Sequence, residues 1–121
     1  MAREFKAGDI LIFQIESGFG LLRVLAIDEA SDEDDVVWHL AAYDDLYLDP
    51  EMADAALTDA ASLRVNVPHL ALTNRAFEST QTARMTNVPV TNTEAARVQS
   101  WRDNPNASVT DISIRLLLGL R

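Results

Sequence analysis

The sequence contains no cysteine among its 121 residues, which excludes disulfides, thiolate metal sites and a cysteine nucleophile. Hydrophobic residues make up 48% of the chain, yet no segment approaches the ~20 uninterrupted apolar residues of a membrane span. The opening MAREFKAGD lacks the apolar region and the cleavage site of a secretory signal. We therefore expect a soluble, cytoplasmic protein that forms a single domain over residues 1–121, and no motif suggests a cofactor.

Basic residues are also scarce, and one long segment of the chain contains none. The net charge is −9, and residues 24–63 contain twelve Asp and Glu but no Lys or Arg. The flanking segments are balanced or slightly basic, with three acids and three bases up to residue 23, and four acids and seven bases from residue 64 onward. An acidic field of this kind repels nucleic acid and anionic lipid, which are bound through cationic contacts to phosphate. It attracts a cationic protein and accelerates the encounter.

Three extended segments are expected in the first third of the chain. The run ILIFQIE, residues 10–16, is apolar on both alternating faces, as in a strand that is covered on each side. Ser17-Gly18 supplies a turn, and FGLLRVLAID, residues 19–28, predicts the second strand of a hairpin. VVWHLAAY, residues 36–43, is β-branched and aromatic enough for a third strand. The acidic octapeptide DEASDEDD, residues 28–35, then becomes the connection between the second and third strands.

Two short helices are expected in later connections. Asp49-Pro50-Glu51 carries the signals of a helix start and predicts a helix over residues 50–61. Thr91 and Glu94 have the spacing of a capping box, which predicts a second helix from residue 92 to about residue 102. The residues expected on the inward face of the second helix are Ala95, Val98 and Trp101.

Extended structure is expected in the two remaining segments. Residues 63–82 have an extended pattern with breaks at Pro68 and Asn74. The tail ISIRLLLGLR, residues 112–121, alternates apolar and polar residues and predicts a closing strand, with a helix beginning near Ser108 as the alternative. The fold class is therefore α+β, with a strongly bent antiparallel sheet or a small partly open barrel and two short helices in the connections.

Metal and catalytic motifs are weak. An EF-hand loop that starts at Asp28 needs Gly at its sixth position and Glu at its twelfth. This sequence has Glu33 and His39 at those positions, so an irregular divalent site in the acidic octapeptide is the remaining alternative. His39 and His69 lack the spacing of a zinc site, and each is interpreted as a structural histidine. No nucleophile elbow or phosphate loop is present. A small hydrolase is the third alternative.

A binding role is better supported, because aromatic residues lie among the acids. In YDDLY, Tyr43 and Tyr47 flank Asp44 and Asp45, and amphipathic rings of this kind are favoured at interfaces; packing against the Ala-rich helix is the equally weighted alternative. Trp38 and Trp101 fall on apolar periodicities and are interpreted as core. The predicted partner-binding residues are Asp28, Glu29, Asp32, Glu33, Asp34, Asp35, Tyr43, Asp44, Asp45, Tyr47, Asp49 and Glu51.

The opening GDILIFQIESGFGLLRVL resembles small bacterial immunity proteins of the Immunity protein 26 type. The resemblance is carried by Gly8-Asp9 at the strand entry, Gly18-Phe19-Gly20 at the turn and Arg23-Val24-Leu25 at the end of the second strand. It covers about twenty residues and does not extend past Ile27. It implies a protein that binds and neutralises a toxin, as in a toxin-antitoxin pair, and it supplies no catalytic residues.

Two functional hypotheses lead. The first is a non-enzymatic binding protein whose acidic surface docks a cationic protein, and the resemblance implies a toxin domain as that partner. The second is a structural or regulatory module that forms a homodimer through the apolar C-terminal strand, in which Leu116, Leu117, Leu118 and Leu120 exceed the needs of one core. No metal or other cofactor is expected in either.

Overall fold

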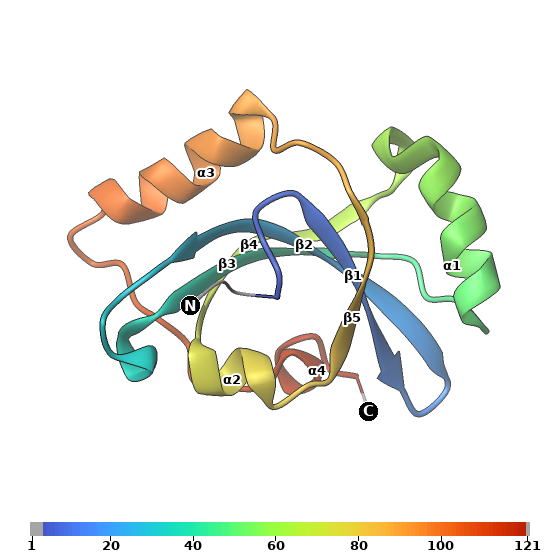
Figure 1. The fold of residues 1–121 in the computed structure, drawn as a ribbon, viewed down its shortest axis with the longest axis horizontal. Coiled ribbons are helices and arrows are strands. Elements are labelled where there is room, and N and C mark those ends of the chain that lie inside the picture. The colour runs from blue at the N-terminus through green and yellow to red at the C-terminus, as the bar shows by residue number, and fades with distance from the viewer. Residues whose placement is uncertain (1–3, 121) are drawn as a thin grey trace.

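The computed structural model describes residues 4–120 and shows an α+β fold built on one antiparallel sheet (Figure 1). The strands are β1 (Asp9–Ile15), β2 (Gly18–Asp28), β3 (Val37–Tyr43), β4 (Val65–Thr73) and β5 (Thr82–Asn87). The helices are η1 (Glu33–Asp35), α1 (Pro50–Ala56), η2 (Leu57–Ser62), α2 (Asn74–Glu78), α3 (Asn92–Asp103) and α4 (Ile114–Leu117). The strand order is β4-β3-β2-β1-β5, so β4 and β5 are the two edges and the described sheet is not closed into a barrel.

The β1–β2 hairpin is confirmed, and its glycines are explained by close approach. Ile15 pairs with Gly18, so the two-residue turn is Glu16-Ser17, one position earlier than expected. A Cβ on Gly20 would lie 2.6 Å from the ring of Phe13, and a Cβ on Gly18 would lie 2.3 Å from the carbonyl oxygen of Tyr47. The two glycines of Gly18-Phe19-Gly20, at the start of β2, therefore follow from packing, which admits no side chain at either position.

The two faces of the sheet differ in composition because alternate residues of a strand point to opposite sides. One face holds the main apolar core and is covered by α2 and α4 (Figure 1). There Trp38 of β3 is stacked on Phe77 of α2 at a ring-centroid distance of 3.8 Å. The other face lies under α1 and α3 and has two small apolar clusters, centred on Ala53 and Val98. Buried polar side chains, including Arg23 and His39, lie on this second face.

The two predicted helices form where they were expected, with adjustments. The first is α1 followed by the 3-10 helix η2, and Asp49 caps it by accepting a hydrogen bond from the amide of Met52 at 2.8 Å. The second is α3, and both hydrogen bonds of its capping box are present. Val98 faces inward as predicted, but Ala95 is exposed, because the helix directs Glu94 rather than Ala95 toward the sheet. None of the helices in residues 4–120 is both long and apolar enough to cross a membrane.

The expected break at Pro68 was wrong, whereas the expected break at Asn74 is confirmed. β4 continues through Pro68, which is tolerated because β4 is an edge strand with one side free of ladder hydrogen bonds. Asn74 does end the extended segment, but it begins the additional helix α2.

The predicted C-terminal strand is replaced by the short helix α4, and the chain around it packs Leu117, Leu118 and Leu120 against the main core. The strand through which a homodimer was expected is therefore absent among residues 4–120, and dimerisation stays a prediction. Leu116 remains exposed.

Candidate functional site

The predicted partner-binding residues form two groups at opposite ends of β3. The acidic octapeptide, with η1, precedes β3, whereas the segment from Tyr43 to Glu51 follows it (Figure 1). A strand of seven residues spans about 20 Å. The structure therefore brings the members of each group together but does not join the two groups into one patch.

Within the octapeptide, Asp28 is occupied by internal partners. Its Oδ2 lies 2.9 Å from Nε2 of His39, and its carboxylate also accepts hydrogen bonds from Arg102 of α3. Burial alone would raise the pKa of Asp28, but the hydrogen bonds from Arg102 and His39 outweigh it and lower that pKa. Asp32 caps η1 by accepting a hydrogen bond from the amide of Asp34 at 3.0 Å. The side chains from Glu29 to Asp35 are exposed, as the solvated connection predicts.

The second group is held to the sheet by backbone hydrogen bonds. The amides and carbonyls of Phe19 and Tyr47 exchange two hydrogen bonds of 2.8 Å, and the amide of Asp44 donates to the carbonyl of Arg64 at 2.8 Å. Arg64 is the first base after the acidic window, residues 24–63. Its side chain also pairs with Asp45 at 2.7 Å and with Asp44 at 3.9 Å. These ion pairs are exposed, so each contributes little to stability.

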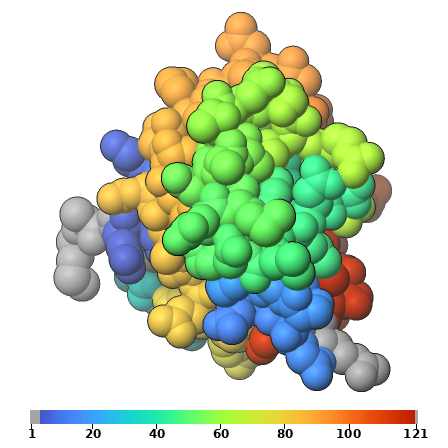
Figure 2. Space-filling model, turned by 90° about the vertical axis from the view of Figure 1, so that its right-hand side faces the viewer, coloured from blue at the N-terminus to red at the C-terminus, as the bar shows by residue number. Residues whose placement is uncertain are grey.

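The tyrosines of this group pack inward, whereas aliphatic side chains are exposed. Tyr43 and Tyr47 pack with the apolar cluster under α1, and burial raises the pKa of both phenols. Leu46, Leu48 and Met52 instead face solvent, with Leu48 77% exposed. In the sequence, these three apolar residues are recognisable because they lie among acids. The prediction relied on aromatic rings and did not include them. This group leads into α1 and η2, which project toward the viewer in Figure 2 between the β1–β2 hairpin in blue and α3 in orange.

A buried polar chain that sequence spacing did not reveal lies between α3 and the sheet. His39 is fully buried, and its Nδ1 lies 2.9 Å from Nε2 of His69, while its Nε2 meets Asp28. The two ring nitrogens of His39 thus join Asp28 on one side to His69 on the other, and the tautomers set the direction of each hydrogen bond. The edge of the Trp101 ring covers His39 at a centroid distance of 4.9 Å. Burial, followed by the charge of His39, lowers the pKa of His69, which keeps this ring neutral.

The two histidines are thus hydrogen-bonded within the fold, and they form a pair rather than two separate sites. The pairing of the two histidines follows from the register of β3 and β4 and not from their spacing in the sequence. His39 pairs with Ala71, so it lies diagonally opposite His69 on the neighbouring strand. Among residues 4–120 no group of three or more His, Cys, Asp or Glu side chains is arranged to hold a metal ion.

Arg23 forms a second buried polar centre that ties α3 to the sheet. Its Nε and Nη2 each donate to the carboxylate of Glu94 at 2.9 Å, and Nη1 and Nη2 donate to the carbonyls of Gly8 and Pro89 at 2.7 and 3.1 Å. The hydrogen bonds from Arg23 are the main cause that lowers the pKa of Glu94 to about 2. This arginine belongs to the motif behind the family resemblance, and its contacts give it a structural role.

These polar groups join helices to strands. The chain matches no protein family, and comparisons with curated proteins and with solved structures find no significant similarity. Its function therefore has to be argued from its own surfaces.

Proposed function

We propose that this chain is a non-enzymatic binding protein that docks a cationic protein on the surface around α1. The residues of this α1 surface are Asp44, Asp45, Leu46, Leu48, Asp49, Glu51, Met52 and Asp54. The observation that carries the proposal is a set of exposed aliphatic side chains surrounded by carboxylates, since Leu46, Leu48 and Met52 are between 47% and 77% exposed. Protein interfaces combine an apolar centre, which supplies affinity, with a polar rim that sets partner choice.

Charge favours a cationic partner. Five carboxylates lie on the α1 surface, and Arg64 is the base that pairs with two of them. Because the Arg64 pairs are exposed, a partner's Lys or Arg can replace them at small cost. The octapeptide at the other end of β3 adds negative charge that reaches beyond the contact and steers approach. The same charge disfavours nucleic acid and anionic membranes as partners.

A toxin domain that is basic because it holds nucleic acid has this chemistry. It is the partner that the resemblance of the N-terminal hairpin to immunity proteins implies. Such a partner would be inhibited by occupation of its phosphate-binding surface, and the chain would need no catalytic residue for this purpose.

The test separates the apolar centre from charge. The chain is used as bait, a retained protein is identified, and its association is measured by surface plasmon resonance at low and high salt. We expect a basic partner, an association rate that falls with salt because exposed charges are screened over about 10 Å at 0.1 M, and at least a tenfold loss of affinity in Leu48→Ala/Met52→Ala.

Leu116→Ala is the matched control, because Leu116 is also exposed but lies in α4 on the opposite face of the sheet. It should leave affinity unchanged. Retention of no basic protein, or equal affinity of the double variant and the wild type, would contradict the proposal. Light scattering on the free chain tests a second copy as the occupant: a dimer that the double variant abolishes would replace the cationic partner.

A further inference from the structure

The C-terminal turn of α3 is attached to the sheet by two adjacent side chains. The edge of the Trp101 ring meets His39 at a centroid distance of 4.9 Å, and the centroid of His69 lies 6.3 Å from that of Trp101. Arg102 donates hydrogen bonds to the carboxylate of Asp28. Because Asp28, His39 and His69 belong to β2, β3 and β4, this one turn is connected to three strands.

The two histidine rings beside Trp101 meet nitrogen to nitrogen. Nδ1 of His39 lies 2.9 Å from Nε2 of His69, whereas the ring centroids are 5.2 Å apart and the ring planes differ by 20°. The rings therefore share a hydrogen bond at their edges and do not overlap face to face. Such a bond needs one proton and one lone pair, whichever ring supplies the proton. Protons on both facing nitrogens leave no acceptor and place two N–H groups against each other.

His39 and His69 differ in their freedom to leave this contact. His39 is 0% exposed, and its other ring nitrogen, Nε2, lies 2.9 Å from Oδ2 of Asp28. His69 lies on the edge strand β4 and is only half-buried. Repulsion between the two rings is therefore relieved by movement of His69 toward solvent, together with the Trp101 ring that contacts both.

The charged groups around the histidines keep their charges in mild acid. Within residues 4–120, Asp28 and Arg102 are the charged side chains that bond to the pair or to each other. Although burial opposes it, hydrogen bonds from Arg102 and His39 lower the pKa of Asp28, and a guanidinium does not lose its proton. At the other end of α3 the pKa of Glu94 is about 2, so its pairing with Arg23 also persists.

Mild acid therefore acts on this contact through the histidines. Burial, followed by the charge of His39, lowers the pKa of His69 below its ordinary value of 6.5. A His69 ring that has left the contact takes up its proton near the ordinary value. Falling pH therefore stabilises the separated rings once it passes 6.5, whereas above this value the proton gives them no advantage.

We propose that the His39–His69 contact is a proton-operated latch for the C-terminal turn of α3. When both facing nitrogens carry protons, the rings separate and Trp101 loses the surface on which it packs. The N-terminal turn stays on the sheet, because Arg23 and Glu94 remain paired. Residues 104–109, which contain turns only, allow the released turn to move, and this movement opens the sheet around His39 to solvent. The latch does not involve the α1 surface, so it stands or falls independently of the proposed protein partner.

NMR of the wild type between about pH 7 and about pH 5 tests the latch. Ring ¹⁵N signals report which histidine nitrogens carry protons, and amide hydrogen exchange reports how firmly α3 is attached. We expect His69 to become doubly protonated while protection of the amides of residues 100–103 falls at least ~10-fold and that of residues 95–97 changes less than ~2-fold. Constant protection of residues 100–103 while His69 takes up its second proton would overturn the proposal, as would a His69 that stays neutral at about pH 5.

A variant at His69 tests whether this ring is the proton acceptor. In His69→Gln an amide lies near the position of Nε2 and does not titrate. Acrylamide quenching of fluorescence reports Trp101, because Trp38 is only 2% exposed. Quenching of the wild type should rise at least ~2-fold between about pH 7 and about pH 5, whereas quenching of His69→Gln should not change.

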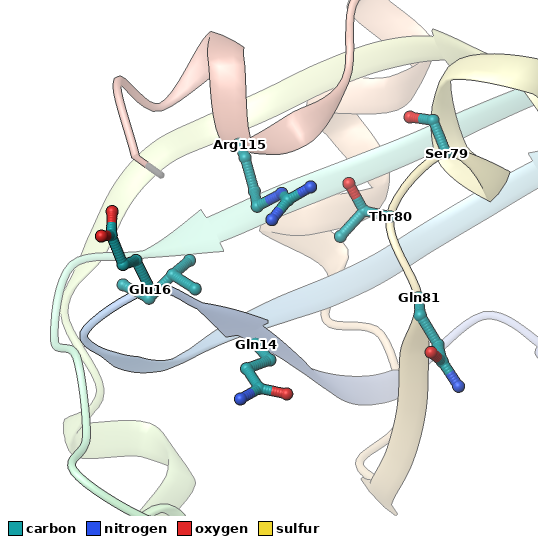
Figure 3. Close-up of a pocket in the computed structure, with 7 residues that line it drawn as sticks. Gln14, Glu16, Ser79, Thr80, Gln81 and Arg115 are labelled. Carbon is teal, nitrogen blue, oxygen red and sulfur yellow. The ribbon is translucent and has the colours of Figure 1, made fainter.

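Arg115→Gln is the matched control, because it also exchanges a cationic side chain for an amide. Arg115 lines a hollow on the face of the sheet that α2 and α4 cover, away from α3 (Figure 3). This variant should respond to acid as the wild type does. An acid response of His69→Gln as large as that of Arg115→Gln would refute the latch.

Discussion

Replacement of Glu94 by Gln tests whether the buried Arg23–Glu94 pair holds α3 on the sheet. Arg23 is 3% exposed and the side chain of Glu94 is 15% exposed, and two hydrogen bonds of 2.9 Å join them. The substitution keeps the size of the side chain but removes its charge. The guanidinium of Arg23 is then left with the carbonyls of Gly8 and Pro89 as its charge-free partners.

The magnitude follows from the pKa of Glu94. This pKa falls from 4.5 to about 2, and each pKa unit corresponds to about 1.4 kcal/mol, so the ionised form gains about 3 kcal/mol on folding. Partial exposure of Glu94 to solvent reduces this gain. The unpaired buried guanidinium of Arg23 adds a cost in the other direction, because breaking a buried ion pair costs about 3–5 kcal/mol. We therefore expect Glu94→Gln to lower the free energy of unfolding by about 3 kcal/mol at neutral pH.

The pH dependence provides a second readout with a definite sign. Because the folded-state pKa of Glu94 is depressed, its contribution is fully present above the unfolded-state value of 4.5 and is lost as pH falls toward about 2. The wild type should lose this part of its stability in acid, and the variant should lack that loss because Gln does not titrate.

Urea unfolding followed by tryptophan fluorescence measures both effects. Glu51→Gln is the control, because Glu51 is an exposed glutamate of α1, and it should change stability by no more than about 0.5 kcal/mol. A loss below about 1 kcal/mol in Glu94→Gln, or an acid-dependent loss as large as that of the wild type, would refute the reasoning.

Three further predictions concern single residues. Burial and His39 lower the pKa of His69, so this ring stays neutral in the folded protein. Stability should therefore fall as pH drops below 6.5, because the unfolded chain takes up a proton on His69. Urea unfolding at a series of pH values should show a smaller pH dependence of stability in His69→Asn. Gly20→Ala should cost about 1–3 kcal/mol by calorimetry, because its Cβ would lie 2.6 Å from Phe13, and an unchanged melting temperature would show that the ring moves freely. Asp49→Ala should cost about 1 kcal/mol through the lost helix cap, with faster hydrogen exchange confined to the start of α1.

Elements with strong local signals could be predicted from the sequence. The hairpin, β3 and the two capped helices were all expected, because glycine turns, β-branched runs and capping residues act within a few positions of one another. The C-terminal segment was assigned to a strand because leucines alternate there. In a run this short, the same leucines also suit a single helical turn that packs Leu117 and Leu118 on the core. The choice between strand and helix therefore depends on packing against the neighbouring α2 and β4.

The candidate sites depend more heavily on the tertiary structure. The sequence by itself determined the excess of negative charge, the absence of cysteine chemistry and most strands, since these are properties of composition and of neighbouring residues. Only the folded chain decided that the acidic window splits at the two ends of β3, that His39 meets His69, and that Trp101 contacts both rings. Such encounters are set by strand register and by the path of connections, so residues thirty or more positions apart become neighbours without any local pattern that records it.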